Sequence, residues 1–318
     1  MNTERDDADR GTRGTSLNAE AERRTPQAIA WPGVGIVGAG AVGTALGVAI
    51  SHTGWPVVAV ASRDATRRDR FCALVPSARA FIEPAPIPDV ADLIIVAVPD
   101  DAIAEVAGQI RLRSGQAIVH TSGAVGAEVL AEAVIEGGDI GAFHPLVSFT
   151  SDVERSVAGI AGATFAIEGD DRSVELLADL VEAIGGTPVR LPPGMKAAYH
   201  AAAVLASGGL VALLDAIVAL GTVAGLDERD SLAVYGRLAE QTLANARGVG
   251  IAASLTGPIT RGDVGTVAAH IAALEAHAPD VVELYLATAR RQLRIAENRG
   301  TLSPNQAARV RRVLAKER

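Results

Sequence analysis

Gly38-Ala39-Gly40-Ala41-Val42-Gly43 is the stretch that decides the fold of this 318-residue chain. The apolar run Val34–Val37 directly before it predicts a short strand, and Thr44–Ser51 directly after it predicts a helix. A glycine-rich turn without a ligand is the alternative. The combination of strand, G-x-G-x-x-G spacing and helix favours a turn that binds an anion at the helix N-terminus.

The positions within this turn have distinct physical roles. Gly38 permits the tight turn, Gly40 lets a pyrophosphate approach the backbone, and Gly43 lets the helix pack closely on the strand. Ala41 and Val42 stand at the helix start between the last two glycines, so we include them among the expected cofactor-binding residues. The turn therefore predicts a dinucleotide site.

From Gly33 to Arg190, short apolar runs alternate with longer helical segments. The predicted strands are Val34–Val37, Val57–Ala61, Leu93–Val98, Ala117–His120, Ile140–Phe143, Thr164–Ile167 and Pro188–Arg190. This alternation predicts βαβ units and a mostly parallel sheet. After the Pro-Pro-Gly stretch at 192–194 only helices are predicted, at 195–224, 227–247, 264–277, 280–298 and 304–317, with Asp227, Asp263 and Ser303 as N-caps.

We therefore expect an α/β chain with a Rossmann-like doubly wound parallel sheet followed by an all-α C-terminal domain. Residues 1–32 are polar and charged, and we expect a disordered tail there. The cofactor-binding domain is expected at 33–192 and the helical domain at 193–318.

The end of the second strand indicates which dinucleotide binds. Ser62-Arg63 stand where binders of NAD and FAD usually carry an acid for the ribose hydroxyls. Arg63 beside the Ser62 hydroxyl suits a 2′-phosphate, with Arg67 or Arg68 helping, so we expect NADP(H) and disfavour a flavin. Asp64 could serve an NAD ribose in a shifted register, but we expect it to cap the following helix.

Two further strand ends carry candidate site residues, because the carboxyl ends of parallel strands face the cofactor crevice. We expect the Val98-Pro99 backbone to line the nicotinamide side and Thr121 to contact the cofactor. Ser122 could bond the substrate or the nicotinamide amide, with Gly123 beside the substrate. Helix capping or turn formation is the alternative for each of these residues.

Composition excludes several classes of function. The 37 acidic against 29 basic residues leave no basic field for nucleic acid. Cys72 is the sole cysteine, which fits a reducing compartment, and no His, Asp or Glu cluster has metal-site spacing. No apolar run resembles a signal peptide, so we expect a cytoplasmic protein.

One apolar stretch, 197–226, is long enough to span a bilayer. It is rich in Ala and Gly and contains His200 and Asp215, so we do not expect it to span a membrane. We expect instead a helix that is buried in a homodimer, which forms through the helical domain.

The motifs together resemble a bacterial family of predicted oxidoreductases, in which a Rossmann-like domain precedes a helical domain of unknown function. The segments that carry the resemblance are Gly38–Gly43, Ser62-Arg63, Val96–Asp100, His120–Gly123, Phe143–Pro145, Lys196–His200 and Leu255–Asp263. The resemblance extends to the larger group of 6-phosphogluconate dehydrogenases, ketopantoate reductases and pyrroline-5-carboxylate reductases. It implies a C-terminal domain like that of 6-phosphogluconate dehydrogenase, dimerisation through this domain, and active sites between domains.

The same resemblance implies a proton donor. In the related β-hydroxyacid dehydrogenases a Lys at a comparable helix start donates the proton, and an Asn four residues later orients the substrate. Lys196 matches the donor, and His200 replaces the Asn one helical turn later. Gly208 likewise stands where this family often has Asn. A surface Lys is the alternative, disfavoured because positive charge is unfavourable at a helix N-terminus.

Three other side chains are candidate substrate ligands. Arg261, on a glycine-flanked loop, could form a two-pronged contact with a substrate carboxylate, and Thr256 could add a hydroxyl. A solvated arginine is the alternative. His144 ends a strand and could face the crevice or serve as a structural hydrogen-bonding group.

Two functional hypotheses follow. The first is an NADP(H)-dependent oxidoreductase acting on a small 2-oxo, 2-hydroxy or imino carboxylate, with ketopantoate the substrate named on family grounds and Lys196 as general acid. The second is a non-catalytic NADP(H) sensor or scaffold. A sensor needs no proton donor, so the Lys196 and His200 pair favours the enzyme.

Overall fold

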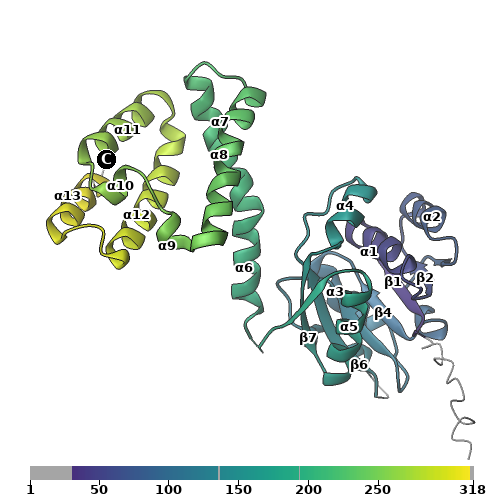
Figure 1. Cartoon of the computed structure of the whole chain (residues 1–318). Helices are drawn as coiled ribbons and strands as arrows, with labels where there is room; N and C mark the ends of the chain where they lie inside the picture. The colour runs from purple at the N-terminus through teal and green to yellow at the C-terminus, as the bar shows by residue number, and fades with distance from the viewer. Residues whose placement is uncertain (1–30, 135–136, 193, 316–318) are drawn as a thin grey trace, which may run out of the picture. The chain divides into compact units, whose positions relative to one another are not determined.

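The structure is a computed structural model that describes residues 31–134, 137–192 and 194–315. A disordered tail was expected at 1–32, and residues 1–30 of it lie outside the described residues. The chain divides into two compact units, with the boundary between Lys196 and Ala197 (Figure 1).

The described residues of the first unit form one eight-stranded sheet, in the order β3-β2-β1-β4-β5-β6-β7-β8. Strands β1 to β6 run parallel in the doubly wound order, β7 is antiparallel to β6, and β8 is parallel to β7. The strands are β1 Val34–Val37, β2 Val57–Ala61, β3 Arg79–Phe81, β4 Leu93–Val96, β5 Ala117–His120, β6 Asp139–Pro145, β7 Thr164–Gly169 and β8 Thr187–Arg190. The expected fold class is confirmed.

Strand β3 is absent from the sequence prediction. It has only three residues, and Arg79 and its neighbour Ala80 are exposed, so no apolar run marks it. The Arg79 guanidinium lies 5.0 Å from the centre of the Phe81 ring. A short edge strand of this kind lacks the buried alternation on which strand prediction depends.

Helices cover both faces of the sheet. Val34 and Ile36 of β1 pack on the face covered by α1, α2 and α5, whereas Val37 packs on the face covered by α3 and η3. The helical elements of this unit are α1 Ala41–Ser51, α2 Ala65–Leu74, η1 Ile87–Asp89, η2 Asp100–Ala102, α3 Ile103–Gln109, η3 Ala127–Ala133, α4 Val153–Ile160 and α5 Asp171–Ala183.

The second unit is helical throughout its described residues. Its elements are α6 Lys196–Ala206, which begins at the last residue of the first unit, α7 Gly208–Val223, α8 Glu228–Val249, α9 Ile251–Ser254, α10 Pro258–Arg261, α11 Val264–His277, η4 Pro279–Val281, α12 Val282–Arg299 and α13 Pro304–Leu314. The single helix expected at 195–224 is interrupted at Ser207, whose φ of −111° and ψ of −87° are not helical.

The three predicted N-caps of this unit are confirmed. Asp227 accepts a hydrogen bond from the Asp230 amide at 2.7 Å, and Asp263 accepts one from the Thr266 amide at 3.0 Å. Ser303 closes a reciprocal capping box with Gln306. Polar residues just before periodic apolar segments therefore predicted these helix starts correctly.

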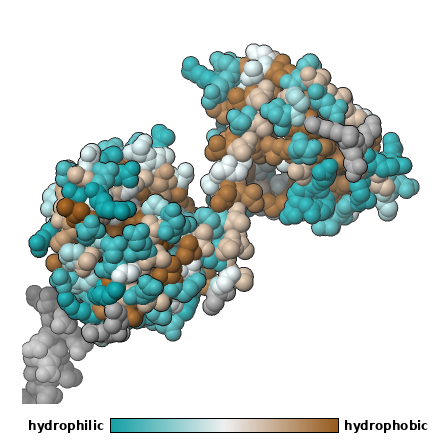
Figure 2. All heavy atoms as spheres, turned by 180° about the vertical axis from the view of Figure 1, so that it is seen from behind, coloured by the Kyte–Doolittle hydropathy of each residue, from teal (hydrophilic) through white to brown (hydrophobic). Residues whose placement is uncertain are grey.

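Large apolar side chains are exposed on the helical unit, as Figure 2 shows. All but Leu284 belong to α6, α7, α8 and α9: Val204, Leu205, Leu210, Val211, Leu213, Val223, Leu232, Val234, Leu238, Leu243, Val249 and Ile251. By length and composition alone, Lys196–Val223 is also the one described segment that could cross a membrane. These helices thus present an apolar surface that the rest of the helical unit does not cover.

Candidate active site

A cleft with a cavity volume of 680 Å³ opens at the carboxyl ends of β2, β1 and β4. This is the side of a doubly wound sheet on which ligands bind, at the point where the strand order reverses. The predicted cofactor residues that line it are Gly38, Gly40, Ser62, Arg63, Val98 and Pro99. Ala41, Val42 and Gly43 form the first residues of α1 immediately beside them.

The three glycines of the turn differ in the structural reason for the absence of a side chain. Gly38 has a φ of 106°, and a Cβ there would lie 2.3 Å from the Ala97 carbonyl oxygen. A Cβ at Gly43 would lie 2.0 Å from the Gly38 carbonyl oxygen. At Gly40 a Cβ would meet nothing within 4 Å. Protein packing therefore explains Gly38 and Gly43, whereas Gly40 keeps a space open at the N-terminus of α1 that fits a pyrophosphate.

The arginines after β2 have separate roles. Asp64 caps α2 by accepting the Arg67 amide at 3.1 Å, as expected, and its carboxylate also pairs with the Arg67 side chain at 3.4 Å. Arg68 donates to the Ser62 carbonyl at 2.5 Å and so holds the loop. Arg63 is exposed and lines the cleft, which leaves its guanidinium as the candidate for a 2′-phosphate.

An acidic residue that sequence reasoning missed also lines this part of the cleft. Glu83 follows β3, the strand absent from the prediction, and its exposed side chain lines the same cleft as Arg63 and Arg67. Ser62-Arg63 thus replace the acid that is usual at the end of β2, but Glu83 after β3 still places a negative charge in the cleft.

The polar segment after β5 forms a buried turn. The Ser122 hydroxyl oxygen accepts the amides of Ala124 and Val125, both at 3.1 Å, which is the turn-forming alternative named for it. The Thr121 amide donates to the Val96 carbonyl at 3.1 Å, and Gly123 is buried. The roles expected for Thr121, Ser122 and Gly123 toward cofactor and substrate stay predictions.

His120 is a fully buried polar residue at the end of β5, on the face covered by η3. Its Nδ1 accepts the Ser122 amide at 3.2 Å, so the proton is on Nε2, which donates to the Gly126 carbonyl at 3.1 Å. Burial, and then the positive charge of Lys196, lower the pKa of His120 to about 4. His120 is therefore neutral near pH 7.

Lys196 is buried and forms an ion pair with Glu168 of β7, with 3.1 Å between Nζ and Oε1. Burial lowers the pKa of Lys196, and the carboxylates of Glu168, Glu128 and Asp100 act in the opposite direction. The surface-lysine alternative is wrong, since only 5% of the residue is exposed. A desolvated ammonium of lowered pKa has the properties of a proton donor.

Strand register explains how this cluster forms. His120 of β5 pairs with Ala142 of β6, which pairs with Glu168 of β7, so these residues form one row across the sheet. The same row continues through Val96 and Val37 to the carboxyl end of β1, where the cleft begins. Strand β6 continues past this row to Pro145, and the antiparallel β7 places Glu168, near its own carboxyl end, opposite Ala142 in the middle of β6.

Asp100 connects the cluster to the cleft electrostatically. It directly follows Pro99, which lines the cleft, and its charge acts on the pKa of both His120 and Lys196. The ammonium of Lys196 is thus within electrostatic reach of the end of the cleft formed by Pro99, and that this end holds the nicotinamide stays a prediction.

The other predicted residues lie on other segments of the described structure. His144 is half-buried in β6, opposite Ala166. His200 lies on α6 in the second unit, and Thr256 and Arg261 are exposed there, with Arg261 ending α10. Their roles stay predictions.

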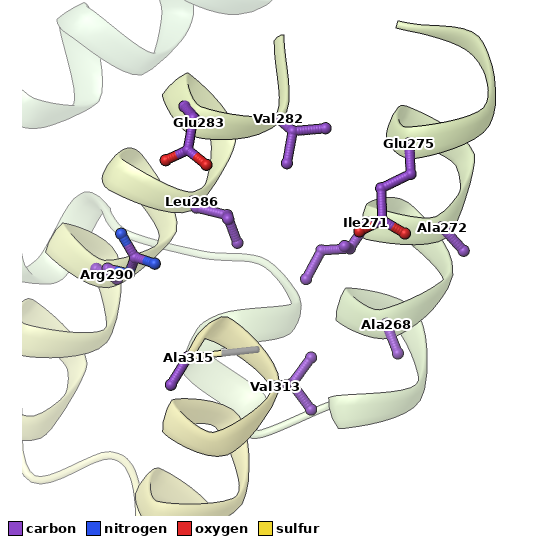
Figure 3. A pocket seen from close by; sticks show the side chains of 10 residues that line it. All are labelled: Ala268, Ile271, Ala272, Glu275, Val282, Glu283, Leu286, Arg290, Val313 and Ala315. Carbon is purple, nitrogen blue, oxygen red and sulfur yellow. The ribbon is translucent and has the colours of Figure 1, made fainter. Parts of the chain in front are cut away.

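A second cavity, of 410 Å³, lies between α11, α12 and α13 (Figure 3). Glu275, Glu283 and Arg290 line it among small and branched apolar side chains, and Arg290 donates to the Leu314 carbonyl at 2.9 Å. It contains no predicted site residue. Across the described residues no group of three or more His, Cys, Asp or Glu side chains could hold a metal ion.

Comparison with solved structures identifies the same two-unit fold in other proteins. An inferred NADP oxidoreductase, BF3122 of Bacteroides fragilis, is 23% identical with a TM-score of 0.68, over 82% of this chain and 98% of its own. Protein TM1727 of Thermotoga maritima is 26% identical with a TM-score of 0.65, over 84% and 99%. The 1-pyrroline-5-carboxylate reductase of Streptococcus pyogenes is 14% identical with a TM-score of 0.60, over 84% and 98%.

The fold and the glycine turn define a Rossmann-like protein with a helical second domain. Residues 20–145 match the model of the Rossmann-like domain, and residues 163–292 match that of a domain of unknown function, DUF2520. The chain therefore consists of a Rossmann-like domain followed by a DUF2520 domain, which confirms the resemblance found in the sequence. The second match begins at β7 and so includes both Glu168 and Lys196. No functionally curated protein matches the sequence.

Proposed function

We propose that this protein is an NADP(H)-dependent oxidoreductase acting on a small 2-oxo, 2-hydroxy or imino carboxylate. The observation that carries the proposal is the buried Lys196–Glu168 pair in the strand row that leads to the cleft. A Rossmann-like protein that only sensed the cofactor would have no use for a desolvated ammonium there.

The chain's own residues fit the cofactor. The open space at Gly40 and the N-terminus of α1 accommodate the pyrophosphate, and Arg63 with Ser62 suits the 2′-phosphate. The Val98-Pro99 backbone would lie beside the nicotinamide. When bound, the cofactor supplies or accepts a hydride.

Lys196 does the proton chemistry. Reduction of a ketone leaves negative charge on oxygen, and Lys196 transfers its proton there and becomes a neutral amine. For a neutral imine, Lys196 protonates the nitrogen before the carbon is reduced. Burial makes this ammonium a stronger acid than an exposed lysine, which favours the transfer.

The substrate class is an extension of this proposal. The structural neighbour named as a pyrroline-5-carboxylate reductase supports a cyclic imino acid, although at 14% identity it shares only the fold. The neighbours give no support to ketopantoate, so we do not propose it. Arg261 and Thr256 are the proposed ligands of the substrate carboxylate, and His200 is proposed to orient the substrate.

The test is a search for NADPH oxidation with cyclic imines and 2-oxo acids, followed by substitution of the proposed donor. Lys196→Ala should lower turnover by about 10²–10⁴-fold and leave NADPH affinity unchanged. Lys316→Ala, the same substitution at the only other lysine of the sequence, is the matched control. Undiminished turnover in Lys196→Ala would remove Lys196 from the mechanism, and tight NADPH binding with no turnover of any compound would favour a sensor.

We also propose that the protein is a soluble cytoplasmic homodimer. The exposed apolar side chains lie on the consecutive helices α6 to α9, and the same surface of a second copy would cover them without exposing new apolar area.

A further inference from the structure

Glu168 is the residue that connects the proposed proton donor to the rest of the site. A single oxygen, Oε1, accepts hydrogen bonds from Nζ of Lys196 at 3.1 Å and from the amide of Ala127 at 3.0 Å. The Glu168 side chain is only 15% exposed, so water screens neither contact strongly.

The Ala127 amide belongs to a peptide group that is bound on both sides. Its other half, the Gly126 carbonyl, accepts the proton of His120 Nε2 at 3.1 Å, and His120 in turn accepts the Ser122 amide. A continuous chain of hydrogen bonds therefore runs from Lys196 through Glu168, the Gly126–Ala127 peptide and His120 to the turn at Ser122. Such chains fix each member more firmly than isolated bonds do.

We propose that Glu168 is a positioning residue: its carboxylate keeps Lys196 charged and fixed, and ties it to the loop that carries Ser122. This inference rests on the proposed function, in which Lys196 is the proton donor. It adds a residue that no motif in the sequence marked.

Charge supports this assignment. The charged and titratable groups around Lys196 are Glu168 from β7, His120 from β5, Glu128 from η3 and Asp100 from η2. Of these, only Glu168 forms a hydrogen bond with Nζ, and it is the largest influence that favours the ammonium against burial. Removing its charge should therefore make Lys196 lose its proton at lower pH.

The sequence makes a direct measurement possible, because it contains only two lysines, Lys196 and Lys316. Selective isotope labelling of lysine gives one resonance for each, and the pH titration of each can be followed by NMR without substrate. Glu168→Gln retains an oxygen that can accept both hydrogen bonds but removes the charge. Glu175→Gln, on the exposed surface of α5, is the matched control.

We expect the titration of Lys196 to move to lower pH in Glu168→Gln and to stay in place in Glu175→Gln, with Lys316 unchanged in both. In the wild-type protein the Ala127 amide resonance should shift with the same midpoint as Lys196, since both bind the same oxygen. The Ala127 measurement uses the wild-type protein, so it does not depend on whether a variant folds. An unchanged Lys196 titration in folded Glu168→Gln, or an Ala127 amide insensitive to Lys196, would overturn the inference.

Kinetics separate this inference from the proposed function. Once a substrate is found, the rate should fall at high pH as Lys196 deprotonates, by about tenfold for each pH unit above the midpoint. In Glu168→Gln this fall should begin at lower pH, whereas a merely structural role would lower the rate equally at every pH. A shifted Lys196 titration without any NADPH oxidation would support the Glu168 assignment and count against the proposed enzyme alone.

Discussion

His120 and Glu168 bind opposite sides of one peptide group, the one between Gly126 and Ala127. Nε2 of His120 donates to the Gly126 carbonyl at 3.1 Å, and Oε1 of Glu168 accepts the Ala127 amide at 3.0 Å. The two side chains come from β5 and β7, on either side of Ala142 in the sheet. The loop between β5 and η3 is thus anchored by a neutral histidine and a charged carboxylate together.

The neutral state of His120 predicts a loss of stability in acid. Above pH 6.5 the histidine is neutral in both folded and unfolded chains, so it contributes no pH dependence. Between 6.5 and its folded pKa of about 4 the unfolded chain takes up a proton that the folded chain does not. The free energy of unfolding should therefore fall by about 3 kcal/mol over this range from His120 alone.

Urea denaturation between pH 4 and pH 8 measures this effect. His120→Asn, whose side-chain oxygen can still accept the Ser122 amide, should lose this part of the pH dependence, whereas His277→Gln at the exposed end of α11 should keep it. The same acid loss in wild type and His120→Asn would show that His120 is not the group responsible.

The glycine turn gives a second prediction, which separates ligand binding from folding. Gly40→Ala adds a Cβ where no protein atom lies within 4 Å, so the stability of the fold should change by less than about 1 kcal/mol. The same Cβ would occupy the space proposed for the pyrophosphate, so NADPH should bind at least about tenfold more weakly. Unchanged NADPH affinity in Gly40→Ala would place the cofactor elsewhere.

Gly43→Ala is the matched variant, with the opposite outcome for folding. Its Cβ would lie 2.0 Å from the Gly38 carbonyl oxygen, so α1 must move away from β1. We expect a loss of at least about 1–3 kcal/mol in the free energy of unfolding. Thermal denaturation of the two variants side by side provides the comparison, and equal stability would contradict the packing role given to Gly43.

The apolar surface of the helical unit gives a third prediction. Leu205 of α6 is 73% exposed and Val211 of α7 is 66% exposed, so Leu205→Glu and Val211→Glu should each convert the proposed dimer to monomers. Leu284→Glu, on α12 outside this surface, should leave the dimer intact. Light scattering at micromolar concentration measures the oligomeric state of each protein. A monomeric wild-type protein would contradict the proposal, and cosedimentation with lipid vesicles would assign the surface to a membrane.

Sequence patterns predicted the fold where burial is regular. Buried strands such as β1 and β5 and side-chain caps such as Asp227 follow local rules, so their positions were predicted closely. The break at Ser207 was missed although two glycines, Gly208 and Gly209, follow it and weaken a helix there, because the apolar run continues on both sides. Strand β3 was missed because an exposed edge strand has no apolar signature.

Residues of the candidate site were likewise predicted where a local signal marks them and missed where none does. The glycine turn, Arg63 and Lys196 were found because each has a motif or a position with physical meaning. Glu168 and Glu83 were not found, since their importance depends on which strands lie side by side. Glu168 is 28 residues before Lys196, and no local spacing links the two. Only the antiparallel pairing of β7 with β6 brings its carboxylate to the row of His120.

Fluorescence titration of the purified protein with NADPH and with NADH measures the cofactor preference on which the proposed function depends. We expect NADPH to bind more tightly than NADH. Arg63→Ala should abolish this preference because the 2′-phosphate loses its cation, and Glu83→Gln should increase it because an opposing charge is removed from the same cleft. Arg68→Ala, whose guanidinium binds the Ser62 carbonyl instead of facing a phosphate, is the control and should weaken both cofactors alike. Equal affinity for the two cofactors, or a preference for NADPH that survives Arg63→Ala, would rule out the proposed 2′-phosphate site at Arg63.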